Sequence, residues 1–371
     1  MLPRLLTAAL AALWLTATAT AGAEKGFALA LEPRPFVFPR DHGAHPEFRT
    51  EWWYYTGVLR ETSGRLYGYQ LTFFRVGLVP ELKGRSSRWA TRDVLFAHFA
   101  LTDVRAGRFR YAERTGRPVL GLAGFSTSSL DVFIRDWSAR MDGRRMRLKA
   151  SFDDATLDVT LTPERPPVLN GERGLSRKGP GKGNANYYYS IPRLKTVGTL
   201  RQGGRAIRLA GMTWMDHEWG TSELAPNQKG WDWFSLRLSD GRDLMLYVLR
   251  DEKGRPTSYS SGMLVEPSGQ TRRLAPRDFR IRALSWWTSP RSKGRYPSGW
   301  EISIPKADLS LRVEPLVKDQ ELITTGTTGV TYWEGIVRAG GTSRGRSVSG
   351  EGYVELTGYA PGSRISPGSG R

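Results

Sequence analysis

Apolar and polar side chains alternate along most of this chain, and this two-residue period limits its fold more than any other feature. Residues 130–135, 146–152 and 157–161 all follow the pattern, and little of the chain after residue 23 has helical periodicity. Successive side chains of a strand point to opposite faces, so this period is typical of strands with one buried face. The sequence therefore predicts an all-β fold, a barrel or a sandwich.

A faint internal repeat divides the chain into two halves. Trp53-Tyr54 is echoed by Trp233-Phe234, and residues 211–214 (GMTW) are echoed by residues 329–332 (GVTY). Such self-similarity predicts two tandem β units of similar strand order. We place the first unit at residues 36–222 and the second at residues 223–360. On this division, the Pro-, Gly- and Arg-rich residues 163–186 form a basic, mobile insertion loop, and residues 361–371 form a disordered tail.

Residues 1–23 have the organisation of a secretory signal peptide. Arg4 gives a positive start, residues 5–15 are an apolar run too short to span a bilayer, and small residues precede a cleavage position after Ala23. This organisation predicts an exported protein, periplasmic or secreted.

Charge and cysteine content narrow the possible partners. The chain of 371 residues carries 55 Lys+Arg against 36 Asp+Glu, a net charge of +19, and has no cysteine. Such a charge favours nucleic acid or an anionic membrane surface, and export argues against nucleic acid. A basic solvated surface without a specific partner is the alternative. The lack of cysteine excludes disulfides, thiol nucleophiles and thiolate metal sites.

The densest candidate site is residues 211–220 (GMTWMDHEWG). If the segment is a strand, His217 and Trp219 share one face, whereas Asp216 and Glu218 share the other. An imidazole beside an indole could orient or protonate a ligand against an apolar wall. The alternative is a hydrogen-bonded structural histidine at a barrel rim.

Residues 41–55 form a second dense stretch, which contains His42 and His45. These histidines could ligate zinc together with Glu47 or Glu51 and with His217, but their spacing fits no defined metal motif, so we expect no metal. The aromatic residues suit an apolar ligand held in the mouth of a small barrel, with filled cores as the alternative. Our candidate ligand-binding residues are Glu51, Trp52, Trp53, Tyr54, Tyr55, His98, Trp231 and Trp233.

Residues 341–345 (GTSRG) match the G-x-S-x-G pattern of hydrolases literally. A nucleophile elbow requires a strand, a sharp turn and a helix, and this segment lies between predicted strands with no histidine downstream. We therefore reject it as a nucleophile.

Residues 51–57 (EWWYYTG), 215–220 (MDHEWG) and 231–234 (WDWF) carry a family resemblance over most of the chain. With these motifs the chain resembles the AttH / carotenoid 1,2-hydratase family of two-domain lipocalin-like proteins. The resemblance implies two tandem, calycin-type antiparallel β-barrels related by a pseudo-repeat. It also implies a cofactor-free hydro-lyase reaction, the addition of water to a carbon–carbon double bond. Other family members are called secreted hydrolases or occur beside ABC-transporter permeases of the lipoprotein-export type.

The resemblance further implies catalytic residues. The family's His-x-Trp pair matches His217 and Trp219, and its Tyr-x-Asp pair aligns with Tyr247 and Leu249, so the second acid is replaced by leucine. Asp216, Glu218, Asp232 and Asp251 are candidates to supply the proton in its place. We therefore expect a protein that binds an isoprenoid or another lipid, with hydratase-type chemistry or, alternatively, as a carrier for an ABC-type export system. A secreted hydrolase is a weaker alternative.

Overall fold

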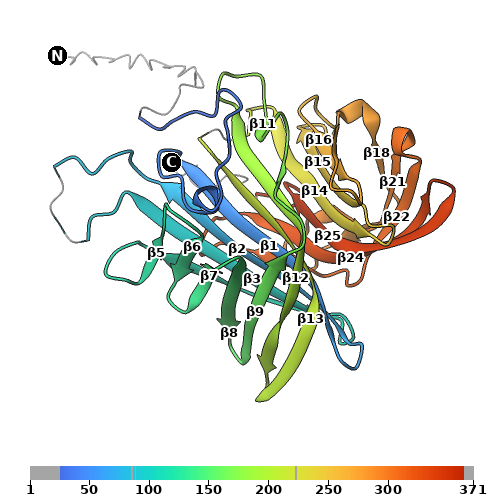
Figure 1. Ribbon diagram of the computed structural model, residues 1–371, viewed down its shortest axis with the longest axis horizontal. Coiled ribbons are helices and arrows are strands. Elements are labelled where there is room, and N and C mark those ends of the chain that lie inside the picture. Colours follow the sequence, from blue (N-terminus) through green and yellow to red (C-terminus); the bar gives the residue numbers. More distant parts are fainter. Residues whose placement is uncertain (1–25, 85–86, 88, 222–223, 363–371) are drawn as a thin grey trace, which may run out of the picture.

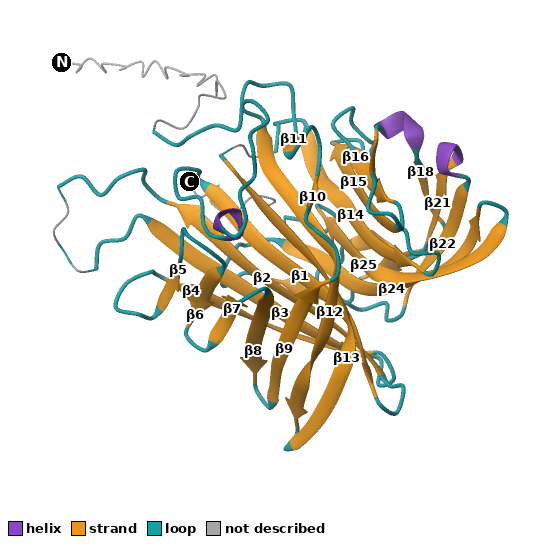
Figure 2. Ribbon diagram, in the orientation of Figure 1, coloured by secondary structure: helices purple, strands orange, loops and turns teal. Residues whose placement is uncertain are grey.

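The computed structural model describes residues 26–84, 87, 89–221 and 224–362. The expected signal peptide, residues 1–23, and residues 363–371 of the expected tail lie outside the described residues. Within the described part of the chain, the helices are three short 3-10 turns, Arg40–His42, Pro276–Asp278 and Pro305–Ala307. None of the helices described is long and apolar enough to cross a membrane. The other regular structure is β-strand (Figure 2), which confirms the all-β prediction.

The first part of the chain forms an antiparallel sheet of thirteen strands that curls into a nearly closed barrel (Figure 1). Its strand order is β4-β3-β2-β1-β13-β12-β9-β8-β7-β6-β5, and β10 and β11 both pair with β12. The strands are β1 (Thr50–Glu61), β2 (Leu66–Gly77), β3 (Asp93–Asp103), β4 (Arg108–Gly116), β5 (Ala123–Phe125), β6 (Asp131–Ile134), β7 (Trp137–Asp142), β8 (Arg145–Phe152), β9 (Ala155–Pro163), β10 (Val168–Leu169), β11 (Leu175–Arg177), β12 (Ala185–Gln202) and β13 (Arg205–Gly220).

The second part forms an antiparallel sheet of ten strands, which curls into a half-barrel. Its order is β17-β16-β15-β14-β25-β24-β22-β21-β18, β23 pairs with β24, and β19 and β20 form a separate pair. The strands are β14 (Gln228–Leu238), β15 (Asp243–Asp251), β16 (Ser261–Val265), β17 (Thr271–Leu274), β18 (Arg280–Ala283), β19 (Trp286–Thr288), β20 (Arg295–Pro297), β21 (Trp300–Ile304), β22 (Leu309–Pro315), β23 (Glu321–Ile323), β24 (Thr331–Ser343) and β25 (Arg346–Thr357).

The strand order repeats between the sheets, as the pseudo-repeat predicted. The run β2-β1-β13-β12-β9-β8 of the barrel corresponds to β15-β14-β25-β24-β22-β21 of the half-barrel. One sequence echo was wrong, however, because residues 211–214 lie in β13, whereas Thr331 and Tyr332 lie in β24, which corresponds to β12. Glycines and aromatic residues recur in many strands, so a four-residue match does not determine which strands correspond.

Residues 163–186 are more ordered than the mobile loop we expected. Strands β10 and β11 of this segment both hydrogen-bond to β12, and Lys178 is only 5% exposed. The segment follows the edge of the barrel sheet because β12 is long enough to pair with β9 along one part and with β10 and β11 along another.

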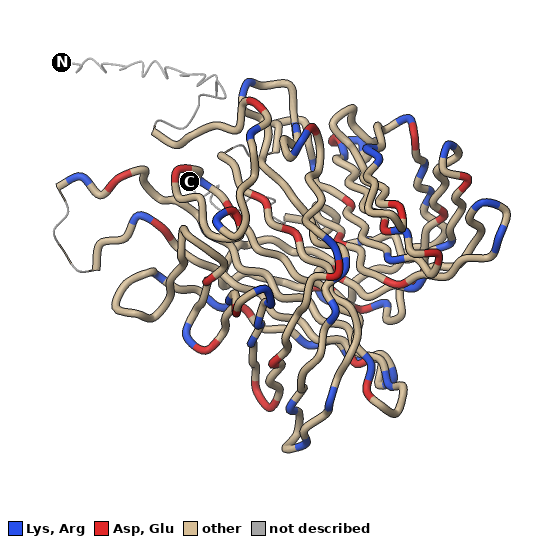
Figure 3. The backbone as a smooth tube through the Cα atoms, viewed as in Figure 1, with Lys and Arg blue, Asp and Glu red and all other residues tan. Residues whose placement is uncertain are grey.

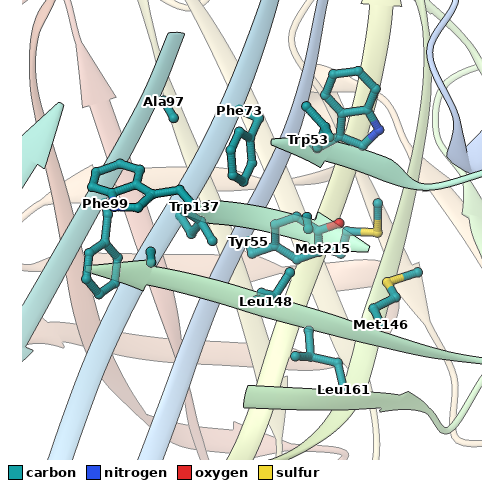
Figure 4. Close-up of a cluster of buried hydrophobic side chains, with 14 of the residues drawn as sticks. Trp53, Tyr55, Phe73, Ala97, Phe99, Trp137, Met146, Leu148, Leu161 and Met215 are labelled. Carbon is teal, nitrogen blue, oxygen red and sulfur yellow. The ribbon is translucent and has the colours of Figure 1, made fainter. Parts of the chain in front are cut away.

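The interior of the barrel is filled by its own side chains. Figure 4 shows part of this core, in which Trp53, Tyr55, Phe73, Phe99 and Trp137 are all buried. The half-barrel has a separate core around Phe234, Trp300 and Trp333.

A third apolar cluster joins the two sheets. Tyr54, Trp214 and other residues on the outer face of the barrel pack against Trp233 and Tyr353 of the half-barrel. The outer face of β1, β2 and β13 is therefore an internal surface of the molecule, and the candidate site lies there.

Candidate functional site

The main cavity lies between the two sheets, and we call it the inter-sheet cavity. It is lined by residues of β1, β2, β3, β12 and β13 on the barrel side and of β14, β15, β24 and β25 on the half-barrel side, and its volume is about 150 Å³. We expected a ligand in the mouth of a barrel. The inter-sheet cavity lies outside the barrel wall, and aromatic and aliphatic side chains occupy the barrel interior. A second pocket, lined by Arg65, Tyr67, Asp103 and Ile207 among others, lies at the hairpin end of the barrel, so a ligand in the barrel mouth stays a prediction.

Two rows of side chains cross the barrel wall on the cavity side. One row consists of His98, Thr72, Tyr54, Asp216 and Ser190, which are direct neighbours across β3, β2, β1, β13 and β12. Cross-strand neighbours of this kind have their Cβ atoms about 5 Å apart and so act as a contiguous surface.

The second barrel row lies two residues further along each strand. It consists of Phe74, Trp52, Glu218 and Tyr188, from β2, β1, β13 and β12. All four residues line the cavity.

An opposing row on the half-barrel consists of Tyr247, Trp233, Glu355 and Glu334, which are neighbours across β15, β14, β25 and β24. Two hydrogen bonds connect it to the barrel rows. The Tyr54 hydroxyl donates to Glu334 Oε1 at 2.7 Å, and the Trp233 indole N–H donates to the Tyr188 hydroxyl at 3.1 Å.

Asp216 is a buried carboxyl group with three donors. The Tyr188 hydroxyl at 2.5 Å, the Ser190 hydroxyl at 2.5 Å and the Trp214 indole N–H at 2.7 Å all donate to it. Burial nevertheless raises the pKa of Asp216 to about 7, although the three hydrogen bonds oppose that shift. The group therefore changes charge near neutral pH.

Glu334 and Glu355 face each other as cross-strand neighbours, and both line the cavity. Burial raises the pKa of Glu355 to about 7, and burial together with the charge of Glu355 raises the pKa of Glu334 well above its ordinary value. Glu334 Oε2 is buried without a hydrogen-bond partner among the described residues. Two neighbouring buried carboxyl groups cannot easily both ionise, so burial beside Glu355 favours the protonated form of Glu334.

Lys178 and His98 are the main basic side chains on this surface. The Lys178 ammonium lies 2.9 Å from Glu218 Oε1 and 4.0 Å from the centre of the Tyr247 ring. His98 bridges the sheets, with Nδ1 at 2.8 Å from the Tyr332 hydroxyl and Nε2 at 2.8 Å from the Thr327 hydroxyl. Burial lowers the pKa of His98 to about 3, so the imidazole is neutral.

His217 and Trp219 lie on the other face of β13, as the alternation predicted, and point into the barrel. His217 Nε2 is 2.9 Å from Glu51 Oε1 and its ring stacks on Trp53, while Trp219 stacks on His45 with ring centroids 3.8 Å apart. Burial lowers the pKa of His217. Neither residue lines the cavity among the part of the chain that the structure describes.

These residues belong to a buried ionic cluster, which we define as Asp41, His45, Glu51, Arg75, Asp93 and His217. Glu51 accepts from His45 Nδ1, His217 Nε2 and Arg75 Nε, each at 2.9 Å, and from the His45 backbone N–H. His45 Nε2 lies 3.1 Å from Asp41 Oδ1, and Arg75 Nη1 donates to Asp93 at 2.8 Å.

The ionic cluster contains three of the residues that we considered for zinc, His45, Glu51 and His217. Ligand atoms of His45, Glu51 and His217 all lie within 4.8 Å of one another. Each already takes part in a hydrogen bond, and the Arg75 guanidinium compensates the Glu51 charge. His42 is instead bonded to the Tyr189 hydroxyl at 2.7 Å.

The structure divides the predicted site residues into two groups. The cavity is lined by Asp216, Glu218, Tyr247, Glu51, Trp52, Tyr54, His98, Trp231 and Trp233. His217, Trp219, Trp53 and Tyr55 are instead buried in the barrel. The roles that we predicted for both groups stay predictions.

Sequence reasoning missed Glu334 and Glu355. Leu249 is buried in β15 as a neighbour of Trp231, and carboxyl groups reach the cavity from β24 and β25 instead. Alternation starting from Tyr332 would have placed Glu334 on the same face, but the sequence does not indicate that Glu355 is its neighbour.

The G-x-S-x-G match lies where β24 turns into β25, and no helix follows it. The Ser343 hydroxyl is bonded to Arg242 and Asp240. This context agrees with its rejection as a nucleophile elbow.

The fold and this site define a class: a β protein with two large antiparallel sheets and an aromatic, acidic cavity between them. The AttH-like family profile matches residues 29–359, and the chain belongs to that family.

Solved structures and a curated relative agree with this assignment. A protein of Nitrosomonas europaea described as AttH is 35% identical, with a TM-score of 0.81 over 90% of this chain and 100% of that chain. Kievitone hydratase of Nectria haematococca has the same fold, with a TM-score of 0.68 at 17% identity over 90% of this chain and 98% of that chain. Kievitone hydratase of Fusarium solani subsp. phaseoli is 24% identical over 247 residues, which are 64% of this chain and 68% of that protein.

Proposed function

We propose that this protein binds an elongated apolar molecule, an isoprenoid or another unsaturated lipid, in the inter-sheet cavity and adds water to one of its double bonds without a cofactor. The single observation that carries the proposal is the pair Glu334 and Glu355, two buried carboxyl groups beside each other on the cavity wall. Membership of the AttH-like family and the likeness to kievitone hydratase support a hydratase-type reaction.

An isolated alkene requires an acid that is still protonated at neutral pH. Glu334 fits this requirement, because its pKa is raised well above the usual range and its Oε2 has no partner in the described structure. The alkene π electrons form the new C–H bond with the Glu334 proton, and the other carbon becomes a cation. Trp231 and Trp233 line the cavity and offer ring faces that stabilise a cation.

Water then forms the C–O bond and must lose a proton. Glu355 and Asp216, with pKa values of about 7, are carboxyl groups suited to accept it. The substrate gains one water, Glu334 loses one proton and its neighbour gains one. Because Glu334 and Glu355 are direct cross-strand neighbours, proton transfer between them restores the starting state.

The test is to supply the purified protein with lycopene and shorter acyclic isoprenoids and to measure hydrated products by mass spectrometry in heavy-oxygen water. We expect labelled alcohol from the wild type and a loss of about 10²-fold or more in Glu334→Gln. Glu301→Gln is the matched control, because Glu301 is an exposed glutamate paired with Arg282 far from the cavity lining. Equal turnover by wild type and Glu334→Gln would remove this site. Equal turnover by wild type and His217→Ala would show that His217 lacks the catalytic role that the family resemblance implies.

A carrier without turnover is the second candidate. The aromatic cavity walls would hold an apolar ligand whether or not the carboxyl groups react, and the net charge of +19 favours an anionic membrane surface. Such a carrier would serve an ABC-type export system. In either case we propose an exported protein, on the basis of residues 1–23 alone. Retained lipid in native mass spectrometry with no hydrated product would favour the carrier.

A further inference from the structure

We propose that the inter-sheet cavity binds a hydrophobic organic cation, an ammonium ion attached to an apolar body, between the aromatic side chains and the carboxyl groups of Asp216, Glu334 and Glu355. This inference rests on the proposed function, because it concerns the same cavity. It adds the charge of the ligand.

The charge of the cavity wall is opposite to that of the protein. The chain has a net charge of +19, and Figure 3 shows Lys and Arg spread over the outer hairpins and loops of both sheets. On the cavity wall, Glu218 is paired with Lys178, and Glu51 is paired with Arg75. Asp216, Glu334 and Glu355 have no ion pair with a basic side chain in the described part of the chain. The wall therefore has an excess of acidic groups.

The carboxyl group of Glu334 lacks a hydrogen-bond partner on one oxygen among the described residues. It is 0% exposed, it lines the cavity, and its Oε2 is buried without a partner among the described residues. Buried polar atoms in native proteins are normally hydrogen-bonded, so such an atom beside free space indicates a missing partner. Because burial beside Glu355 favours the protonated form of Glu334, a single cation beside the pair would compensate the one charge that Glu355 gains on ionising.

The rest of the wall suits the body of such a ligand. Trp52, Trp231 and Trp233 line the cavity together with Tyr54, Tyr188 and Tyr332. Aromatic faces attract ammonium groups, and cages of aromatic rings are a common way to recognise methylated ammonium ions. An engineered cavity of similar volume holds benzene, so one aromatic ring or a short chain fits in about 150 Å³.

Cation binding should release protons. Asp216 and Glu355 have pKa values of about 7, and a cation beside them favours their ionised forms. The affinity for a permanent cation should therefore rise with pH through this range, whereas the affinity for a neutral ligand should not. The other titratable groups that line the cavity with these carboxyls are Glu51, Tyr54, Arg75, His98, Lys178, Tyr188, Glu218, Tyr247 and Tyr332. His98 is already neutral at neutral pH, because burial lowers its pKa to about 3, and burial raises the pKa of the tyrosines well above the usual value.

The same electrostatics serve the proposed reaction, because an ammonium ion carries the same single positive charge as a tertiary carbocation. A cavity that stabilises the cationic intermediate should bind its stable analogue more tightly than a neutral molecule of the same shape.

The experiment compares benzyltrimethylammonium with neopentylbenzene, its uncharged carbon isostere, and with phenylacetate. Binding to the full-length protein is measured by tryptophan fluorescence and by calorimetry in two buffers of different ionisation enthalpy, at about pH 6 and about pH 8. We expect the ammonium to bind about ten-fold more tightly than neopentylbenzene at the higher pH. We expect it to release protons at the lower pH, where Asp216 and Glu355 are still largely protonated. We expect phenylacetate to bind more weakly than either.

The double variant Glu334→Gln/Glu355→Gln should lose most of the preference for the ammonium, because only Asp216 remains, but keep its affinity for neopentylbenzene, which also reports that the cavity is intact. An ammonium preference that is undiminished in this variant overturns the assignment. Equal or weaker binding of the ammonium to the wild type overturns the cation inference and leaves the proposed apolar site standing. Failure of both ligands to bind overturns both.

Discussion

Glu51 of β1 and Glu334 of β24 are both buried glutamates that line the inter-sheet cavity, but their hydrogen-bond partners differ. Glu51 accepts hydrogen bonds from the side chains of His45, His217 and Arg75 and from a backbone N–H. These bonds hold its pKa well below the usual value. Glu334 accepts one hydrogen bond, from the Tyr54 hydroxyl, and its pKa is raised well above the usual value.

The comparison shows that burial alone does not determine the charge of a carboxyl group. Burial opposes ionisation in both residues, and the number and charge of the donors decide the outcome. A carboxylate with all its positions occupied stabilises the fold, whereas a neutral carboxyl with a free oxygen beside a cavity is available for chemistry. Four predictions test this contrast.

The largest effect is expected for Glu51→Gln. The substitution removes one of the two buried carboxylates that pair with Arg75, and breaking a buried ion pair on one side costs about 3–5 kcal/mol. Urea denaturation should show a loss of this size. Glu301→Gln, in an exposed pair, should change the free energy of unfolding by less than about 1 kcal/mol. Similar small losses in both variants would contradict a structural role for the ionic cluster.

Glu355→Gln should stabilise the protein, and the gain in the free energy of unfolding should depend on pH. Folding raises the pKa of Glu355 from 4.5 to about 7, so between these values the folded protein binds a proton that the unfolded chain does not. The stability of the wild type therefore falls as pH rises through this window, and the variant avoids the penalty. The variant should gain on the order of 2 kcal/mol over the wild type between about pH 5 and about pH 8. A difference that does not change with pH would show that Glu355 titrates normally.

Tyr54→Phe should cost about 1–2 kcal/mol, because it removes the hydrogen bond to Glu334 and leaves that carboxyl without a donor. Tyr55→Phe is the matched control. The Tyr55 hydroxyl is buried without a partner among the described residues, so its removal should not destabilise the protein. Thermal unfolding of both variants at one pH measures the difference, and equal losses would argue against the role of the Tyr54 bond.

The smallest expected effect is that of added zinc. The ligand atoms of His45, Glu51 and His217 are already hydrogen-bonded to one another. The positive charge of Arg75, which pairs with Glu51, would repel a zinc ion bound there. We expect no change in Tm when zinc is added in excess. An increase that a chelator reverses would show that the ionic cluster is a metal site.

Much of the fold was accessible from the sequence, and the site was accessible only in part. Alternation within residues 211–220 placed His217 and Trp219 opposite Asp216 and Glu218 correctly, because that property depends on strand geometry alone. It did not indicate which face borders free space. We expected the imidazole face to do so, and the structure places Asp216 and Glu218 at the cavity instead.

The sequence by itself determined the all-β class, the two related units and the division of each strand into two faces, because these features follow from local periodicity. Tertiary structure decided that the outer face of the barrel would be buried against a second sheet. It also decided that Glu334 and Glu355 would meet there as neighbours. The pKa values of these groups depend on desolvation and on charges from strands far apart in the chain, and those quantities exist only after the sheets have packed.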